Sequence, residues 1–185
     1  MAERYGFFNA VNQGGTYDRV YMAEDFAEAM SSFIATGVFD EDEQDLQVLP
    51  PDIQGMQVKV NSGRAWINGY WYVNDSPITY EVDVSDGVQT RIDAVILRWG
   101  ASERTIQIAY VKGTLSASSP QKYQPQRTTS YHELVLGYIT VGPSTANIQS
   151  SAIEDTRNSS ELCGMIANAN LIGPIDNETI DDIIV

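Results

Sequence analysis

Basic residues, cysteine and histidine are scarce in this chain of 185 residues. Its 11 Lys and Arg are outnumbered by 25 Asp and Glu, which gives a formal net charge of −14, and the basic residues form no cluster. Nucleic-acid binding requires such clusters because the phosphate backbone is anionic, so we exclude that class of function. The single cysteine, Cys163, and the single histidine, His132, provide neither a disulfide partner nor the ligands of a structural zinc. The sequence therefore predicts a protein of a reducing compartment that carries no cofactor.

Long apolar runs are absent as well. Residues 1–5 mix acidic and basic side chains and lack the apolar stretch of about 7–15 residues that a secretory signal contains. No segment approaches the run of about 18 apolar residues that a membrane-spanning helix needs. Hydrophobic residues still make up 43% of the chain, which is enough to build a core. We therefore expect a soluble protein made in a cytoplasm, with no membrane insertion.

The N-terminal part of the sequence predicts an arm followed by a helix. Residues 1–20 are rich in Asn, Gly and aromatic side chains without periodicity, which predicts an extended arm that lies against its own core or a partner. Residues 21–39 contain one predicted α-helix, from Ala23 to Thr36, with Gly37 as its C-cap. The apolar stripe of this helix consists of Met22, Phe26, Met30, Phe33 and Ile34.

The apolar period then changes to two, which predicts a β-rich domain over residues 40–160. Its first six residues, Asp40–Asp45, form a polar connection. The expected strands are Leu46–Leu49, Met56–Val60, Arg64–Ile67, Tyr70–Val73, Ile78–Val84, Arg91–Trp99, Thr105–Lys112 and Glu133–Val141. About eight strands without intervening helices predict a mainly β fold, either a β-sandwich or a partly open barrel.

Three local features refine this prediction. Asn68-Gly69 predicts a type I′ hairpin turn that sets Trp66 opposite Trp71. The strand Arg91–Trp99 is apolar through its middle, as expected of a strand covered on both faces. Residues 113–130 form a polar loop whose length indicates that it is either functional or mobile. In the last segment, 161–185, we expect a short helix and an acidic tail; the helix would contain Leu162, Met165, Ile166 and Ala169.

Candidate catalytic groups are few. Two carboxylates on apolar strands, Asp93 and Glu133, are the residues with which a glycosidase would work. The alternative is that each forms an ion pair with a nearby arginine such as Arg91 or Arg98, at a strand edge or turn. Neither His132 nor Cys163 has the sequence context of a catalytic triad. The run Asp40–Asp45 lacks the Gly and Glu of a calcium-binding loop and reads as a solvated linker. We therefore predict no enzyme and no metal site.

Aromatic residues are concentrated in the predicted hairpin, namely Trp66, Tyr70, Trp71 and Tyr72. Two interpretations stay open. The four rings form a platform on which sugar rings stack, or they pack in the core or at a subunit interface.

A series of segments resembles tail and baseplate structural proteins from phages and prophages of Gram-positive bacteria. It begins with Tyr5–Asn12, Tyr17–Arg19, Tyr21–Glu28 and Phe33–Phe39. It continues with a G-x-A-W-I-x-G-Y segment at Gly63–Tyr70, and then with Arg91–Arg98, Glu133–Ile139 and Ile153–Arg157. The likeness runs in order over about residues 5–165, and its specificity lies in the series rather than in any one segment.

The resemblance implies a virion component that anchors host-attachment parts to the tail or baseplate. It also implies a homo-oligomer, with a trimer favoured, that contacts other tail or baseplate proteins. Such proteins carry a fibre or receptor-binding head in a C-terminal extension, whereas this sequence ends at Val185. We assign the assembly contacts to six aromatic residues, Tyr5, Phe7, Phe8, Tyr17, Phe26 and Phe33. The alternative function is a carbohydrate-binding module that recognises a host surface polysaccharide.

Overall fold

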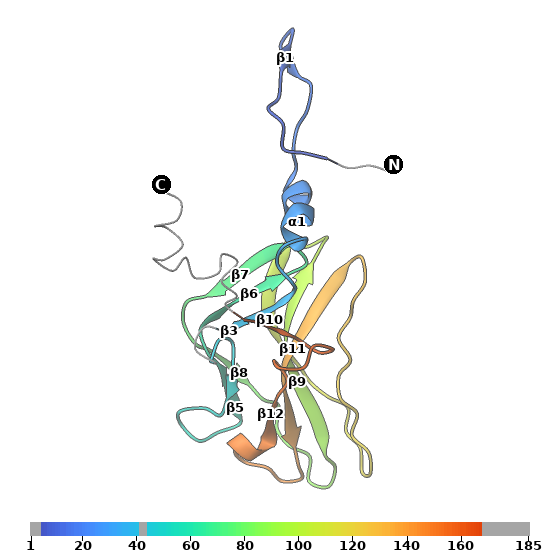
Figure 1. The fold of residues 1–185 in the computed structure, drawn as a ribbon. Coiled ribbons are helices and arrows are strands. Elements are labelled where there is room, and N and C mark those ends of the chain that lie inside the picture. The colour runs from blue at the N-terminus through green and yellow to red at the C-terminus, as the bar shows by residue number, and fades with distance from the viewer. Residues whose placement is uncertain (1–4, 41–43, 168–185) are drawn as a thin grey trace, which may run out of the picture.

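The polypeptide is built mainly from β-strands, and the computed structural model describes residues 5–40 and 44–167. The elements in chain order are β1 (Asn12–Gln13), β2 (Thr16–Tyr17), α1 (Ala23–Ser31), β3 (Gly37–Asp40), β4 (Val48–Leu49), β5 (Gln57–Val60), β6 (Gly63–Ile67), β7 (Tyr70–Asn74), β8 (Ile78–Glu81), β9 (Arg91–Gly100), β10 (Thr105–Val111), β11 (Tyr131–Val141), the 3₁₀ helix η1 (Ser150–Ala152), β12 (Ile153–Asp155) and β13 (Met165–Ala167). Figure 1 shows a β-rich body from one end of which α1 and the β1–β2 hairpin project. The predicted fold class, a mainly β sandwich-like protein with an N-terminal arm and helix, is confirmed.

Three sheets form the body. The sheet with the longest strands, called the largest sheet below, has the strand order β10-β9-β11-β12. The second sheet also has four strands, in the order β13-β3-β6-β7, and the third has the order β4-β5-β8. One buried cluster combines side chains of all three sheets, for example Leu97 from the first, Ile67 from the second and Val58 from the third. The largest sheet therefore packs one face against the two smaller sheets, and the sheets stay open instead of closing into a barrel.

The opposite face of the largest sheet is covered by a loop. Ala94 and Ile96 of β9 belong to a second buried cluster, against which Tyr123 packs. Tyr123 lies in the connection 113–130, whose length is therefore used to cover the sheet. This arrangement confirms that β9 is covered on both faces, which is why its sequence is apolar without alternation.

The predicted strands and the hairpin register are confirmed. All eight expected strands are present. β4 lacks the first two expected residues and β8 ends three residues early, at Glu81, whereas the other strand ends differ by two residues at most. In the β6–β7 hairpin, Trp66 pairs with Trp71 and Ile67 pairs with Tyr70. Asn68 and Gly69 have φ angles of 51° and 84°, the positive values that a type I′ turn requires.

The predicted end of the helix is wrong. α1 ends at Ser31. The hydroxyls of Ser31 and Ser32 both donate hydrogen bonds to the backbone carbonyl of Glu28, at 2.8 and 3.3 Å. Such side-chain bonds compete with the helical backbone pattern. Gly37 is not a C-cap but the first residue of β3, where an added β-carbon would lie 2.6 Å from the Gly164 carbonyl oxygen.

The short helix expected near the end of the described chain is also wrong. Met165 and Ile166 lie in β13, which pairs in parallel with β3 through Met165 and Val38. A neighbouring strand distant in sequence thus overrides the helix-like spacing of the apolar residues. Leu162, also expected in this helix, lies in a turn before β13. Ala169 and the acidic tail lie outside the described residues. The strands β1, β2, β3, β12 and β13 were not predicted. The pairing of β13 with β3 joins segments far apart in sequence and leaves no local pattern.

Candidate functional site

The helix α1 is mounted on the turn of the β6–β7 hairpin. A β-carbon at Gly69 would overlap the carbonyl of Ala27, so the turn and the helix backbone are in direct contact. Ala27 is the buried residue of this nine-residue helix. Next to this contact, the backbone N–H of Asn68 donates to the hydroxyl of Thr36 at 3.1 Å. The helix therefore packs on the body through its small residue Ala27, and its large apolar residues lie outside this contact.

The apolar stripe of α1 faces solvent. Met22, Phe26, Met30 and Phe33, which the sequence places on one side of the helix, are all exposed. The N-terminus of the helix is nevertheless well formed, because the Met22 N–H donates to the Asp25 carboxylate at 2.7 Å. The predicted helix is thus confirmed, but its stripe does not contact the core of the same chain.

The arm folds back on itself as a small hairpin. Strand β1 pairs with β2 through Asn12 and Tyr17, and Gly14-Gly15 turns the chain with positive φ angles. The Asp18 carboxylate accepts a hydrogen bond from the Val11 N–H at 2.7 Å. Bonds from Arg19 and from Val11 lower the pKa of Asp18, which stays charged near neutral pH. Polar bonds rather than burial therefore hold the arm in shape.

Aromatic contacts join the arm to the helix. Phe7 stacks on Phe26 with ring centroids 4.8 Å apart, and Tyr21 lies 5.2 Å from Phe7. The Tyr21 hydroxyl accepts a hydrogen bond from the Phe8 N–H at 2.8 Å. Tyr5 and Phe8 meet edge to face. Four of the six predicted assembly residues thus take part in ring contacts, Phe7 with Phe26 and Tyr5 with Phe8.

The other two predicted assembly residues, Phe33 and Tyr17, take no part in these ring contacts. Phe33 lines a groove of about 460 Å³ between the arm and α1, together with Tyr5 and Phe7. Tyr17 lies in β2, in the hairpin that projects farthest from the body in Figure 1.

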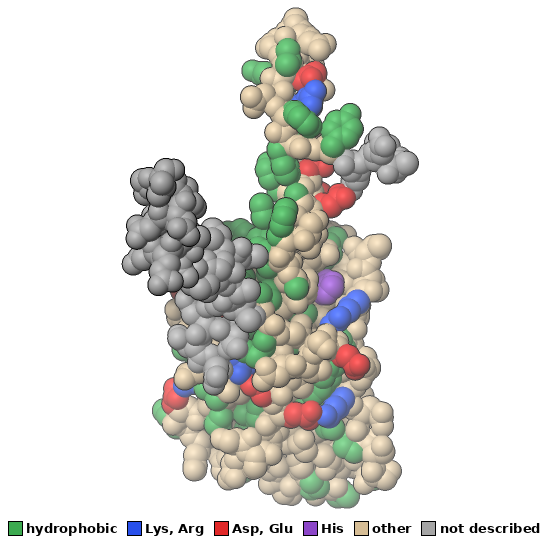
Figure 2. Space-filling model, viewed as in Figure 1, with side chains coloured by type: hydrophobic (Ala, Val, Ile, Leu, Met, Phe, Trp, Pro, Cys, Tyr) green, Lys and Arg blue, Asp and Glu red, His purple; other side chains and the backbone are tan. Residues whose placement is uncertain are grey.

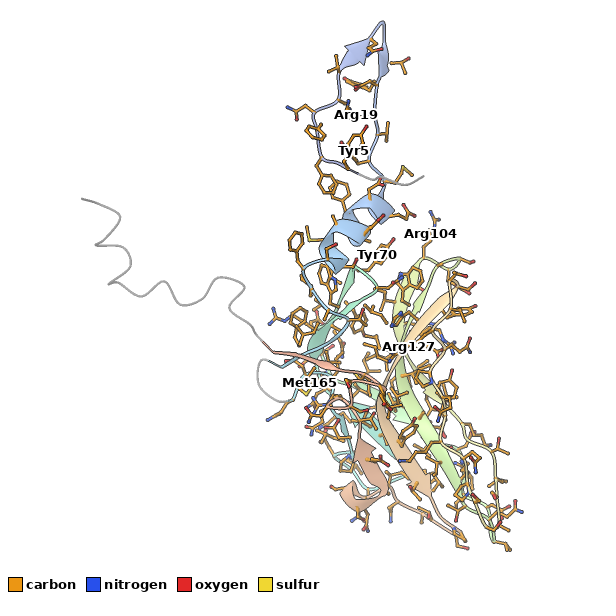
Figure 3. All side chains as sticks on the ribbon, turned by 45° about the vertical axis from the view of Figure 1, so that its right-hand side comes forward. Tyr5, Arg19, Tyr70, Arg104, Arg127 and Met165 are labelled. Carbon is orange, nitrogen blue, oxygen red and sulfur yellow. The ribbon has the colours of Figure 1, made fainter. Side chains whose placement is uncertain are left out.

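We define the arm–helix surface as the large apolar side chains of residues 5–33 that are 41–80% exposed. They are Tyr5, Phe7, Phe8, Val11, Tyr17, Val20, Met22, Phe26, Met30 and Phe33. Figure 2 shows hydrophobic side chains along the projecting arm and helix, and Figure 3 shows Tyr5 and Arg19 on the arm, away from the body. Apolar patches of this kind mark interaction sites in soluble proteins.

The aromatic hairpin does not form a single platform. Trp66 and Trp71 pair on the outer face of the β6–β7 hairpin, and Trp71 is 70% exposed. Tyr72 instead packs against the main core. Tyr70 stacks on Trp99, with ring centroids 5.8 Å apart and 28° between the planes. Sequence reasoning missed Trp99, because the stack joins two sheets and leaves no local pattern.

The two candidate catalytic carboxylates are buried in structural networks. Asp93 accepts hydrogen bonds from Arg91 at 2.9 Å, from the Tyr110 hydroxyl at 2.5 Å and from the Gly113 N–H at 2.8 Å. Burial and the Asp93 charge raise the pKa of Tyr110. Asp93 is fully buried in the central strand β9. The predicted ion pair with Arg91 is confirmed, but its expected position at an edge or turn is wrong.

Glu133 of β11 has an equivalent environment. It accepts hydrogen bonds from Arg98 at 2.6 Å and from both the Tyr123 hydroxyl and the Gln126 N–H at 2.7 Å. The ion pair with Arg98 is therefore confirmed, again with a fully buried carboxylate. Because Tyr123 and Gln126 belong to the connection 113–130, Glu133 ties that loop to the largest sheet.

The remaining reactive side chains lack catalytic partners among the described residues. Burial raises the pKa of the Cys163 thiol to about 12, which keeps it protonated. Burial also lowers the pKa of His132, whose Nε2 atom has no hydrogen-bond partner in the described ranges. Within residues 5–40 and 44–167, no three acidic, His or Cys side chains are placed to hold a metal ion.

Comparison with protein-family models and with curated proteins gives no match. In the part of the chain that the structure describes, no helix is long and apolar enough to cross a membrane.

Proposed function

We propose that this protein is a non-enzymatic structural component of a phage tail or baseplate. In this proposal the arm–helix surface binds copies of the same chain and neighbouring tail proteins in the virion, and so anchors host-attachment parts. The observation that carries the proposal is the exposure of this surface, which leaves ten large apolar side chains in solvent.

A second protein surface would complete the packing of α1. α1 has nine residues. Isolated helices shorter than about 12–15 residues are not stable in water on their own. Tertiary packing must therefore stabilise it, yet among residues 5–40 and 44–167 its single buried side chain is Ala27. Each large apolar side chain that a partner covers contributes about 1.5–3 kcal/mol. The stripe of Met22, Phe26 and Met30 offers several such contributions along one line.

The exposed residues of the helix favour self-association. Phe26 and Met30 lie one turn apart on α1, whereas Met22 is its N-cap and Phe33 follows its C-cap, so the four side chains form one short apolar line that a second copy of the same segment can cover. Closed symmetry is the usual form of protein self-assembly. The resemblance to tail and baseplate proteins favours three copies, with the three stripes facing a common axis.

The buried polar groups support a structural rather than an enzymatic role. Asp93 and Glu133, the two carboxylates with catalytic potential in the sequence, are each held by three partners and have no exposed surface. General acids and bases must reach a substrate proton within hydrogen-bond distance. Both carboxylates instead stabilise the largest sheet and its covering loop.

Light scattering coupled to size-exclusion chromatography tests the proposal. The wild-type chain should have the mass of a defined oligomer, with three copies expected. Changing both Phe26→Gln and Met30→Gln keeps side chains that suit a helix but removes the apolar stripe, so the mass should fall to that of one chain. The matched control changes two exposed apolar residues of the body, Ile53→Gln and Val88→Gln, and should leave the mass unchanged. A wild-type monomer, or loss of the oligomer in the control alone, would contradict the proposal.

A further inference from the structure

A groove separate from the arm–helix surface lies between the edges of two sheets. β7 is the edge strand of one sheet and β10 is the edge strand of the largest sheet. The groove between them has a volume of about 590 Å³ and reaches the first turn of α1. This volume falls within the range of about 300–1,000 Å³ that is typical of small-molecule sites. Figure 3 shows Tyr70 and Arg104, two of its lining residues, at the end of the body that carries α1.

Four aromatic residues are among the residues that line the groove. Tyr70 and Trp99 form a stacked pair, Trp71 reaches the groove from the exposed side, and Tyr72 contributes from the core side. Aromatic faces are flat, rigid and apolar, and the Tyr hydroxyl adds a polar group at the ring edge. Burial and the negative charge of Glu24 raise the pKa of Tyr70, so its hydroxyl keeps its proton and can donate a hydrogen bond. Such a lining suits a ligand with flat C–H faces and hydroxyl edges.

Two opposite charges flank these rings. Glu24 lies in the first turn of α1, and Arg104 lies in the β9–β10 turn with a φ angle of 51°. Across the described residues, neither side chain takes part in a hydrogen bond or an ion pair. A carboxylate accepts and a guanidinium donates, so together they can satisfy hydroxyl groups, which do both. Because the local pair is neutral and the whole chain carries −14, the groove favours an uncharged ligand over a polyanion.

We propose that this groove binds a neutral oligosaccharide, whose sugar rings pack on Tyr70, Trp71 and Trp99 while Glu24 and Arg104 bond its hydroxyls. The residue set differs from the aromatic platform predicted from the sequence. Trp99, Glu24 and Arg104 enter it, whereas Trp66 is not among the lining residues. Since the groove does not use the stripe of α1, its function is independent of self-association through that stripe.

Tryptophan emission of the full chain, titrated with a panel of neutral hexose and N-acetylhexosamine oligosaccharides, tests the proposal. At least one oligosaccharide should change the emission with a dissociation constant in about the millimolar range. Arg104→Asn, which tolerates the positive φ angle, and Glu24→Gln should each weaken binding by about tenfold. Trp71→Phe should reduce the emission change, whereas Trp66→Phe should retain it. Thermal melting of each variant establishes that it is folded.

Three results would overturn the proposal. The first is a panel in which no oligosaccharide changes the emission of the wild-type protein. The second is an emission change that Arg104→Asn and Glu24→Gln leave intact, which would place the sugar elsewhere. The third is an emission that responds to protein dilution but to no sugar, which would mean that the groove is filled by the arm of a second copy.

Discussion

Gly69 and Ala27 are in direct contact, the first in the turn of the β6–β7 hairpin and the second in α1. This contact sets the helix on the body, because a β-carbon at Gly69 would overlap the Ala27 carbonyl. Gly69 thus meets two requirements at once, the positive φ angle of the turn and the close approach of the helix backbone.

The contact leads to a prediction for Gly69→Ala. The positive φ angle alone costs about 1–2 kcal/mol for a residue with a side chain, and the overlap with Ala27 adds to it. We expect a loss of more than about 2 kcal/mol in the free energy of unfolding, together with faster hydrogen exchange in α1. Denaturant titration and exchange measurements check both. Gly87→Ala is the matched control, because a β-carbon there meets open space and should change stability by less than about 0.5 kcal/mol.

The buried pair of Arg91 and Asp93 should be essential for stability. Asp93→Asn removes the charge that compensates the fully buried guanidinium of Arg91, so we expect a loss of about 3–5 kcal/mol in the free energy of unfolding. Asp83→Asn gives the comparison, since its ion pair with Lys112 is exposed on both sides and contributes about 0–1 kcal/mol. Equal effects of the two substitutions in denaturant titrations would contradict a structural role for Asp93.

Glu133 should control the loop that covers the largest sheet. Glu133→Gln keeps the shape of the side chain but weakens its bonds to Arg98, Tyr123 and the Gln126 N–H. Hydrogen exchange should therefore become faster at residues 123–127, while the strands of the body keep their relative protection. Glu103→Gln removes an exposed carboxylate that is bonded to the Tyr131 hydroxyl, and it should leave exchange in the loop unchanged. Unchanged exchange at Gln126 in Glu133→Gln would refute this assignment.

The single histidine gives the protein a defined pH dependence. Burial, with a smaller contribution from Arg127, lowers the pKa of His132 below its ordinary value of 6.5. The unfolded chain then binds this proton more readily than the folded protein. The free energy of unfolding is therefore unaffected by His132 above pH 6.5, and it falls as the pH drops from 6.5 towards the pKa of His132 in the folded protein. The slope cannot exceed about 1.4 kcal/mol per pH unit for one proton. Unfolding titrations between pH 7.5 and 5.5 should show this loss in the wild type and not in His132→Gln.

Elements with a local signal could be predicted from the sequence. The positive-φ pair Asn68-Gly69 fixed the register of a hairpin, and the apolar middle of β9 indicated cover on both faces. The stripe of α1 predicted the helix, but periodicity does not specify what covers a stripe, and here it is exposed. β13 was missed because its pairing with β3 joins segments far apart in sequence.

The candidate sites could be predicted only in part for the same reason. The arm could be recognised as a segment apart from the core because it is rich in Phe and Tyr without periodicity, whereas the assembly role of these residues stays a prediction. The partners of Asp93 and Glu133 were also found, since an arginine lies near each on the same or the adjacent strand. The groove could not be predicted from the sequence. It depends on how two sheets and α1 are placed, since this placement stacks Tyr70 on Trp99 and brings Glu24 and Arg104 to one groove.

The parallel pairing of β13 with β3 also orders events during synthesis. β3 follows α1 closely, yet its partner Met165–Ala167 leaves the ribosome only after almost the whole body has been made. The sheet that supports α1 through the β6–β7 hairpin is therefore incomplete until translation has passed residue 167. The exposed apolar side chains of the arm–helix surface are therefore synthesised first, whereas the sheet on which α1 rests is completed last.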